Sequence, residues 1–202
     1  MLGRRLSYLL FLDHPKNVAV SLLGKYIIRE LPEGKIIAKI TEVEAYGGFE
    51  DDACHVSRFG KTKKTEGLFG KVGCAYIYSV HINTYCLNVV CHKENHAGGI
   101  LIRAAQPIEG IELIFKNQNK PFSLEKLLDK KLLNNILKGP GKLCRGLRID
   151  TSLNGEDMIN GEKLYLLEGE KVDFSKVLKT PRINIPYAKK SKNWLWRFLI
   201  EE

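Results

Sequence analysis

An extended β-strand is predicted for the segment Lys35-Ile36-Ile37-Ala38-Lys39-Ile40-Thr41-Glu42-Val43-Glu44-Ala45-Tyr46. The turn signal Leu31-Pro32-Glu33-Gly34 comes directly before it, and an apolar run over 25–31 comes before the turn. Two runs of strand-forming residues joined by a short turn are typical of a β-hairpin. We therefore expect 25–31 and 35–46 to pair as neighbouring strands.

The end of this strand carries an unusual set of side chains. Side chains alternate between the two faces of a strand, so Glu42, Glu44 and Tyr46 point the same way. The intervening Val43 and Ala45 point the other way. A carboxylate is costly to bury unless it is paired or does chemistry. A carboxylate beside an aromatic ring in an apolar segment therefore indicates a pocket that holds a flat ring and aims a base at it.

More strands follow along the chain. Apolar segments at 74–80 and 85–91 flank the turn His81-Ile82-Asn83-Thr84, and a further strand is predicted at 99–105. The long segment 47–73 is charged and punctuated by glycine. This pattern is typical of an irregular functional loop with a short helix at most.

Helices are predicted at three places. The first covers 18–24, and the second starts at Pro107, which is followed by apolar residues at helical spacing. The third runs from Ser123 and stops before Gly139. Strands outnumber helices and do not alternate regularly with them, which favours an α+β class with a largely antiparallel sheet, in a single domain over 1–202.

The composition indicates a globular protein with a basic surface. The chain of 202 residues is 44% hydrophobic, which is enough for a sizeable core, and its formal net charge is +9. Basic residues gather at 58–64, 138–148 and 189–192. Such clusters can converge on one surface that binds a polyanion, so we expect nucleic acid as a partner. Solvated lysines of a generally basic proteome would give the same composition.

The cysteine count and the hydropathy of the chain indicate the cellular compartment in which the protein works. The five cysteines are odd in number and form no C-x-x-C pair, which favours reduced thiols in a cytosol. The apolar start of the chain is cut short by Asp13-His14-Pro15, and no segment approaches the roughly 20 apolar residues of a membrane span. We expect a cytoplasmic protein, in the bacterial cytosol or nucleoid, that does not contact membranes.

A glycine-rich turn at 139–142 invites a phosphate-loop interpretation. A Walker A motif needs glycine at position 136 and a hydroxyl residue after the lysine, but the chain has Ile136 and Leu143 there. Nucleotide hydrolysis by that route is therefore excluded. The turn with Lys142 and Arg145 could still bind a DNA or RNA phosphate. A plain helix-ending turn explains the sequence equally well.

Acidic residues between 42 and 55 leave a metal site open as an alternative. The candidate ligands are Glu42, Glu44, Glu50, Asp51, Asp52 and His55. Oxygen-rich clusters suit magnesium or manganese, and a basic protein with such a site would be a metal-dependent nuclease. In the competing interpretation, the acidic residues over 50–52 lie in a solvated loop and cap helices.

Two tyrosines lie on one face of a predicted strand. Tyr76 and Tyr78 are two residues apart, so they could form an aromatic core row or one wall of a slot. Together with Tyr46 and a carboxylate they could stack on a base, and their π faces would favour a cationic ring. Alkylated purines carry that positive charge, which weakens the glycosidic bond and allows a carboxylate-activated water to complete its cleavage.

These residues resemble the motifs of a known family. The segment 42–46, with Glu50-Asp51 and His55 downstream, is similar to the E-x-E-A-Y…E-D…H signature of the alkyladenine (3-methyladenine) DNA glycosylases. Further segments follow in the family's order and spacing: Gly67-Leu68-Phe69, Tyr76-Ile77-Tyr78, Cys86-Leu87-Asn88, Leu101-Ile102-Arg103-Ala104 and Gly139-Pro140-Gly141-Lys142-Leu143-Cys144. The similarity runs from about Leu22 to Arg197. It implies a single α+β domain with a curved sheet, flanking helices and a protruding β-hairpin.

The resemblance implies a catalytic pair. Glu44 is expected to be the general base that activates water, and Arg103 to help hold that water. An arginine in a run as apolar as 100–105 needs an anionic partner if it is buried. The family implies one-step hydrolysis that leaves an abasic site, without a metal, another cofactor, a lysine nucleophile or strand cleavage.

The resemblance also implies substrate-binding residues. Tyr46 and Tyr78 are expected to sandwich a flipped base, with Tyr76 on the pocket floor. His55 would add a ring contact and a hydrogen bond, or it could simply cap backbone groups. Asn88 would discourage the exocyclic amine of normal guanine, or it could bond across the hairpin.

The hairpin tip departs from the family's pattern. The family usually places a tyrosine followed by glycine there, as a wedge that fills the gap left by the flipped nucleotide, whereas this chain has His81 and Ile82. A wedge helps to offset an unstacking cost of roughly a few kcal/mol. His81 can stack and is the favoured wedge, and Ile82 is the alternative.

The expected function is that of a base-excision-repair DNA glycosylase. It would act as a monomer on double-stranded DNA with damaged purines, namely 3-methyladenine and, as further candidates, 7-methylguanine and hypoxanthine. A metal-dependent nuclease and a non-catalytic nucleic-acid-binding protein stay open as alternatives.

Overall fold

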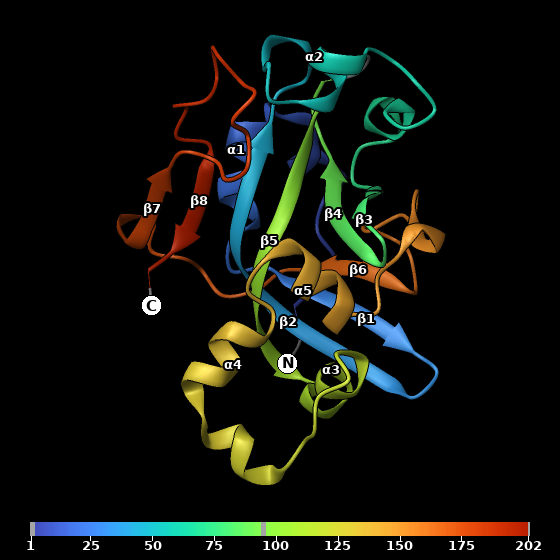
Figure 1. Cartoon of the computed structure of the whole chain (residues 1–202), viewed down its shortest axis with the longest axis vertical. Helices are drawn as coiled ribbons and strands as arrows, with labels where there is room; N and C mark the ends of the chain where they lie inside the picture. The colour runs from blue at the N-terminus through green and yellow to red at the C-terminus, as the bar shows by residue number, and fades with distance from the viewer. Residues whose placement is uncertain (1–2, 94–95, 202) are drawn as a thin grey trace.

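The computed structural model of the chain describes residues 3–93 and 96–201, which contain one antiparallel sheet of eight strands (Figure 1). The strands are β1 (Tyr26–Leu31), β2 (Gly34–Tyr46), β3 (Ala75–His81), β4 (Thr84–Val90), β5 (Gly99–Glu109), β6 (Leu164–Leu167), β7 (Val177–Thr180) and β8 (Arg197–Ile200). The main order is β3-β4-β5-β2-β1-β6, while β8 pairs with β2 and β7 pairs with β8. The predicted α+β class with an antiparallel sheet is confirmed.

Short helices flank this sheet. The α-helices are α1 (Pro15–Leu22), α2 (His55–Phe59), α3 (Ile111–Asn117), α4 (Lys130–Ile136) and α5 (Pro140–Gly146). The 3-10 helices are η1 (Tyr8–Leu12), η2 (Gly48–Glu50), η3 (Glu66–Phe69), η4 (Leu124–Leu128), η5 (Thr151–Leu153) and η6 (Phe174–Lys176). Helix α1 packs against β2 and β5, and α5 packs against β4 and β5. In the described part of the chain, no helix is long and apolar enough to cross a membrane.

Strand β2 gives the sheet its curvature. Its pairing with β5 shifts register after Ile37, after Ile40 and again after Glu42. Such bulges bend a strand and re-aim its side chains. On its other side, β2 pairs first with β1 and then, from Glu42 to Glu44, with β8. The bend therefore lies directly beside Glu44, and the curved sheet that results is visible in Figure 1.

One large apolar core, with smaller clusters beside it, holds these elements together. Among the fully buried side chains are Phe11, Leu22, Ile27, Ile36, Ile40, Leu87, Ile100, Phe115 and Phe198. Complete burial of each such side chain contributes about 1.5–3 kcal/mol relative to exposure. Because α1, α3 and strands from both edges contribute to this core, the end of β2 is held in a rigid setting.

The predicted pairing of 25–31 with 35–46 and of 74–80 with 85–91 is confirmed by the hairpins β1–β2 and β3–β4. The helix predicted from Pro107, however, starts at the wrong residue. Pro107 lies in β5, opposite Ala38, and α3 begins only at Ile111 after the left-handed Gly110 (φ 73°). A proline lacks the N–H that a ladder needs, so strands tolerate it at edges and bulges. Pro107 meets that condition because the register shifts beside Ala38 and β4 pairs only with residues 99–101 of β5.

The long helix predicted from Ser123 is also wrong. The segment forms η4 and then α4, with a break at Asp129, whose carboxylate accepts a hydrogen bond from the backbone N–H of Leu132. Leu124 and Leu128 are 76% and 84% exposed, so the expected apolar face exists only in the second half. Gly139 does not end a helix in a plain turn but precedes α5 as its N-cap, with φ 104°. The domain boundaries 1–202 stay a prediction.

Candidate functional site

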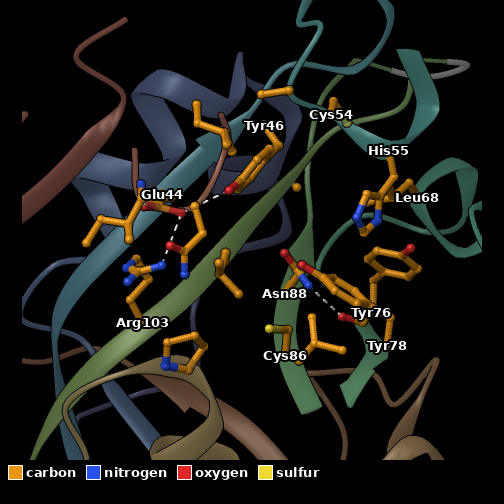
Figure 2. A pocket seen from close by; sticks show the side chains of 18 of the residues that line it. Glu44, Tyr46, Cys54, His55, Leu68, Tyr76, Tyr78, Cys86, Asn88 and Arg103 are labelled. Carbon is orange, nitrogen blue, oxygen red and sulfur yellow. Dashed lines mark hydrogen bonds and ion pairs between the residues drawn. The ribbon is translucent and has the colours of Figure 1, made fainter. Parts of the chain in front are cut away.

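One cavity of about 390 Å³ opens beside the end of β2. It is lined by side chains from β2, β3, β4, β5 and α2, by the start of α5 and by the segment 183–187. Eight of the residues predicted from the sequence line it: Glu44, Tyr46, His55, Tyr76, Tyr78, His81, Asn88 and Arg103. Figure 2 shows most of them converging on one space, with Glu44 and Arg103 on one side and the His55–Tyr78 group on the other.

Glu44 is fully buried at the inner wall of the cavity. Its Oε2 accepts a hydrogen bond from the Tyr46 hydroxyl at 2.9 Å and lies 3.4 Å from Nη1 of Arg103. Its Oε1 accepts a hydrogen bond from the backbone N–H of Ile183 at 2.8 Å. Burial disfavours the carboxylate form and raises the pKa of Glu44, although Arg103 pulls in the opposite direction. Glu44 is therefore a stronger base than an exposed glutamate.

Glu42 lies on the same side of β2 and has the opposite electrostatic character. Its Oε1 accepts hydrogen bonds from Nε of Arg103 at 2.8 Å and from Nε of Arg197 at 2.6 Å. Burial opposes the charged form, but the two arginines outweigh it and lower the pKa of Glu42. The expected anionic partner of Arg103 is thus confirmed, and Arg103 is held between the two carboxylates.

The opposite wall of the cavity is aromatic. The His55 ring packs edge-on against Tyr78 at 4.7 Å between centroids, and Tyr78 lies 5.6 Å from Tyr76. Tyr46 stands apart from this group, beside Glu44 (Figure 2). Burial, with a smaller contribution from Arg58, lowers the pKa of His55, so its imidazole is neutral at pH 7. Together these rings form a slot that is suited to a flat ligand.

Tyr76 forms the buried side of this wall. Its hydroxyl donates a hydrogen bond to the backbone carbonyl of Lys64 at 2.9 Å, and burial raises its pKa to about 12. A Cβ at Gly67 would lie only 2.9 Å from Cδ2 of Tyr76, so glycine at that position leaves room for the ring. This contact gives the Gly67-Leu68-Phe69 motif a physical role.

Asn88 both lines the cavity and bonds within the hairpin. Its Nδ2 donates to the backbone carbonyl of Tyr76 on the paired strand at 3.1 Å, and the side chain is buried. The cross-hairpin bond that was left open as an alternative is therefore present. It fixes the amide beside the aromatic wall rather than removing it from the cavity.

The residues predicted to contact DNA lie at and outside the mouth of this cavity. His81 lines it, while Ile82 is 92% exposed at the tip of the β3–β4 hairpin. Lys142 and Arg145 are exposed on α5, whose first residues, Pro140 and Gly141, line the cavity.

All six candidate metal ligands contact other protein groups, and two of them, Glu42 and Glu44, share Arg103. Glu42 and Glu44 bind arginines, Glu50 lies 2.9 Å from His14, and His55 packs on Tyr78. Asp51 pairs with Arg182, and Asp52 accepts hydrogen bonds from the backbone of 189–191. Within residues 3–93 and 96–201, no group of three or more His, Cys, Asp or Glu side chains could hold a metal ion. The solvated-loop interpretation is wrong for Asp51, which is fully buried.

A segment near the C-terminus was missed by the sequence analysis. Ile183 bonds to Glu44, Arg182 is buried against Asp51, and Tyr187 lies under the Arg58 guanidinium at 3.8 Å from its ring centroid. The signal that marked Arg103, an arginine in an apolar run, is absent around Arg182, because Thr180 and Asn184 interrupt the sequence on either side.

The fold therefore holds one cavity in which a buried carboxylate, Glu44, lies across from an aromatic wall. Residues 10–202 match the model of the family described as methylpurine-DNA glycosylase (MPG). The chain is 41% identical over 185 residues to a protein of Desulfitobacterium hafniense (strain Y51), which covers 92% of this chain and 89% of that protein. It is 40% identical over 187 residues to a protein of Clostridium tetani (strain Massachusetts / E88), with 92% and 90% covered.

Both relatives carry the name "Putative 3-methyladenine DNA glycosylase". With the family model matching nearly the whole chain, this chain belongs to the methylpurine-DNA glycosylase family. The resemblance found in the sequence is confirmed, and so is the predicted type of enzyme, a DNA glycosylase.

Proposed function

We propose that the protein flips alkylated purines, with 3-methyladenine as the main substrate, out of double-stranded DNA and hydrolyses their N-glycosidic bond. Water activated by Glu44 is the nucleophile, and the product is an abasic site. 7-Methylguanine and hypoxanthine are further candidate substrates. The enzyme acts as a monomer in base excision repair, and we assign it to the bacterial cytosol and nucleoid, where its substrate lies.

The observation that carries this proposal is the contrasting setting of Glu42 and Glu44, two carboxylates on one strand. Glu44 is fully buried in the cavity wall, whereas Glu42 is bound by two arginines, and their pKa values shift in opposite directions. Environments that push the pKa values of neighbouring acids apart divide their chemical roles. Glu42 stays ionised and anchors Arg103. Glu44, with its raised pKa, is the group that accepts a proton.

The hydrogen bonds of Glu44 indicate which of its oxygens acts as the base. A carboxylate oxygen has two lone pairs. Oε2 is engaged by the Tyr46 hydroxyl and by Arg103, whereas Oε1 receives only the Ile183 N–H among the residues that the structure describes. A lone pair of Oε1 is therefore available to accept a hydrogen from water.

The chemistry follows from the charge of the substrate. An alkylated purine such as 3-methyladenine carries a positive charge and is a good leaving group. The oxygen of water bonds to C1′, the C1′–N bond breaks with its electron pair going to the base, and Glu44 takes the water proton. A cationic alkylated purine therefore leaves uncharged, whereas hypoxanthine, which is neutral in DNA, would leave as an anion. No enzyme–DNA bond forms in either case. Arg103, held by Glu42, orients the water and the ionised Glu44.

The aromatic slot supplies selectivity for the cationic base. Tyr46 and Tyr78 stack on its two faces, and a neutral His55 adds an edge contact. Asn88, fixed by its bond to the Tyr76 carbonyl, disfavours the exocyclic amine of normal guanine. His81 or Ile82 fills the gap in the duplex, and Lys142 and Arg145 bind phosphates next to the cavity mouth.

Release of free base from methylated duplex DNA in EDTA tests the proposal, with wild type beside Glu44→Gln. We expect release by the wild type and a loss of about 10²–10⁴-fold in the variant, the range for a general base, with DNA binding retained. A metal-dependent nuclease would be inactive in EDTA and would cut the backbone. A non-catalytic binding protein would bind DNA with steep salt dependence and release no base.

A further inference from the structure

A buried ion pair lies behind the catalytic end of β2. Nη1 and Nη2 of Arg182 contact Oδ2 and Oδ1 of Asp51 at 2.5 and 2.7 Å, and both side chains are 0% exposed. The same two oxygens accept the backbone N–H groups of Gly47 at 3.1 Å and Ala53 at 3.0 Å. Asp51 thus ties Arg182 to the loop that directly follows Tyr46.

Arg182 also binds β2 itself. Its Nη1 donates to the carbonyl of Ala45 at 2.8 Å, so it holds the backbone between Glu44 and Tyr46. Its guanidinium carbon lies 4.7 Å from the centroid of the Tyr46 ring and 5.4 Å from that of Trp196. A planar guanidinium can make a bidentate ion pair and stack on aromatic faces at the same time, which a lysine ammonium cannot do.

The next residue along the chain touches the base. Ile183 donates its N–H to Oε1 of Glu44 at 2.8 Å, and this is the oxygen whose remaining lone pair is available to water. The position of that N–H depends on where Arg182 holds the segment. A buried ion pair adds little net stability over apolar packing, so a positional role accounts better for one at this place.

We propose that Arg182 is a positioning residue for catalysis. Locked by Asp51 and by the Ala45 carbonyl, it fixes the Ile183 N–H against Oε1 of Glu44 and the Tyr46 ring against the substrate. It therefore sets the direction of the Glu44 lone pair that receives the water proton. This inference rests on the proposed role of Glu44 as general base.

Three variants test the inference in single-turnover base release at saturating enzyme. Arg182→Lys keeps the charge that compensates Asp51 but loses the bidentate geometry. Ile183→Pro keeps both members of the ion pair, Arg182 and Asp51, and deletes the N–H that donates to Glu44. Arg5→Lys is the matched control, because Arg5 also stacks on a tyrosine (3.5 Å above Tyr165) and bonds a carbonyl, but outside the cavity lining.

We expect Arg182→Lys and Ile183→Pro each to lower the single-turnover rate by about 10- to 100-fold, the scale for a misplacement of roughly 1 Å. Affinity for duplex DNA and the folded fraction, measured by near-UV circular dichroism at the assay temperature, should stay close to those of the wild type. Arg5→Lys should keep the wild-type rate. In nuclear magnetic resonance spectra, the Ile183 amide shift should follow the ionisation of Glu44 in the wild type and lose that response in Arg182→Lys.

Wild-type rates in both Arg182→Lys and Ile183→Pro would overturn the inference. So would a rate loss that matches the unfolded fraction, because Arg182 would then only stabilise the fold. If the wild type itself releases no base, the proposed function fails instead, and the two failures are thus distinguished.

Discussion

Tyr46 donates its hydroxyl hydrogen to Oε2 of Glu44 at 2.9 Å, although the two residues are next-but-one neighbours on the same strand. Residues two apart share a face of a strand, and the register of β2 is regular from Val43 to Tyr46, so these two side chains lie side by side on one face. In the proposed mechanism, the ring that stacks on the substrate therefore also donates a hydrogen bond to the general base. Tyr46 would then take part in both substrate binding and proton acceptance.

Replacing Tyr46 by phenylalanine should shift the pH dependence of base release. The hydroxyl stabilises the ionised form of Glu44, so its loss raises the already elevated pKa of Glu44 further. A hydrogen bond to a charged group contributes about 1.5–3 kcal/mol, and one pKa unit is about 1.4 kcal/mol. We therefore expect the midpoint of the acid limb of the rate profile to move to a higher pH by about one to two units. Tyr165→Phe is the control, because Tyr165 bonds Glu30 at 2.8 Å outside the cavity lining. An unmoved acid limb in Tyr46→Phe would exclude this coupling.

Glu44→Gln should make the protein more stable at neutral pH. Because burial raises the pKa of Glu44 in the folded state, that state binds the proton more tightly than the unfolded chain. The contribution of Glu44 to stability is therefore lost as pH rises from about 4.3, the ordinary value of glutamate, through the raised pKa. Glutamine has no proton to lose. Urea unfolding at several pH values should show a stability gain in the variant above this window that disappears below it.

A loss of stability in Glu44→Gln, instead of the expected gain, would contradict the raised pKa of Glu44. If Glu44→Gln were less stable than the wild type at neutral pH, the attraction of Arg103 for the Glu44 carboxylate would exceed the cost of its burial. The raised pKa would then be wrong, and the division of roles between Glu42 and Glu44 would lose its basis.

Arg103→Met should destabilise the fold far more than a similar change at the surface. Arg103 bridges Glu42 and Glu44, and its side chain is 10% exposed. Removing one partner of a buried ion pair costs about 3–5 kcal/mol, because a charge is left uncompensated. Arg148 donates hydrogen bonds to both carboxylate oxygens of Glu33 but is 43% exposed, so Arg148→Met should destabilise the fold far less. Equal losses of the free energy of unfolding in the two variants would contradict the buried character of the Arg103 pair.

Local rules predicted the parts of this fold that local interactions determine. The strands ending at Leu31 and Tyr46 follow from alternation and from one turn signal, and the shared face of Glu42 and Glu44 follows from the period of a strand. The site was predictable to the same extent, because its central residues lie on strands whose geometry fixes which side chains share a face.

The features that local rules predicted wrongly or missed depend on contacts between residues that are far apart in the sequence. Pro107 has the local signature of a helix start, but its position opposite Ala38 at a bulge keeps it in β5. Arg182 reaches the site from 131 positions beyond Asp51 and 137 beyond Ala45. No local pattern encodes contacts over such separations. An arginine in an apolar run marked Arg103 as a residue that needs a buried partner, but Arg182 has no such run around it.

The hairpin tip offers the last test, because its two candidate wedges lie in different settings. His81 lines the cavity, whereas Ile82 is 92% exposed beside Asn83, whose positive φ of 54° turns the chain. A side chain at the cavity mouth is better placed to occupy the space that a flipped nucleotide leaves. We therefore expect His81→Ala to slow base release from duplex DNA by about tenfold or more, because the wedge offsets part of the few kcal/mol that unstacking costs.

Ile82→Ala should slow release less, and neither variant should change the free energy of unfolding by more than about 0.5 kcal/mol, because both side chains are on the surface. Single-stranded methylated DNA has no stacked gap to fill, so it distinguishes a wedge from a residue that acts on the base. Both variants should release base from it at the wild-type rate. A larger loss in Ile82→Ala on duplex DNA would identify the isoleucine as the wedge. Equal losses on single and double strands would mean instead that His81 contacts the base itself.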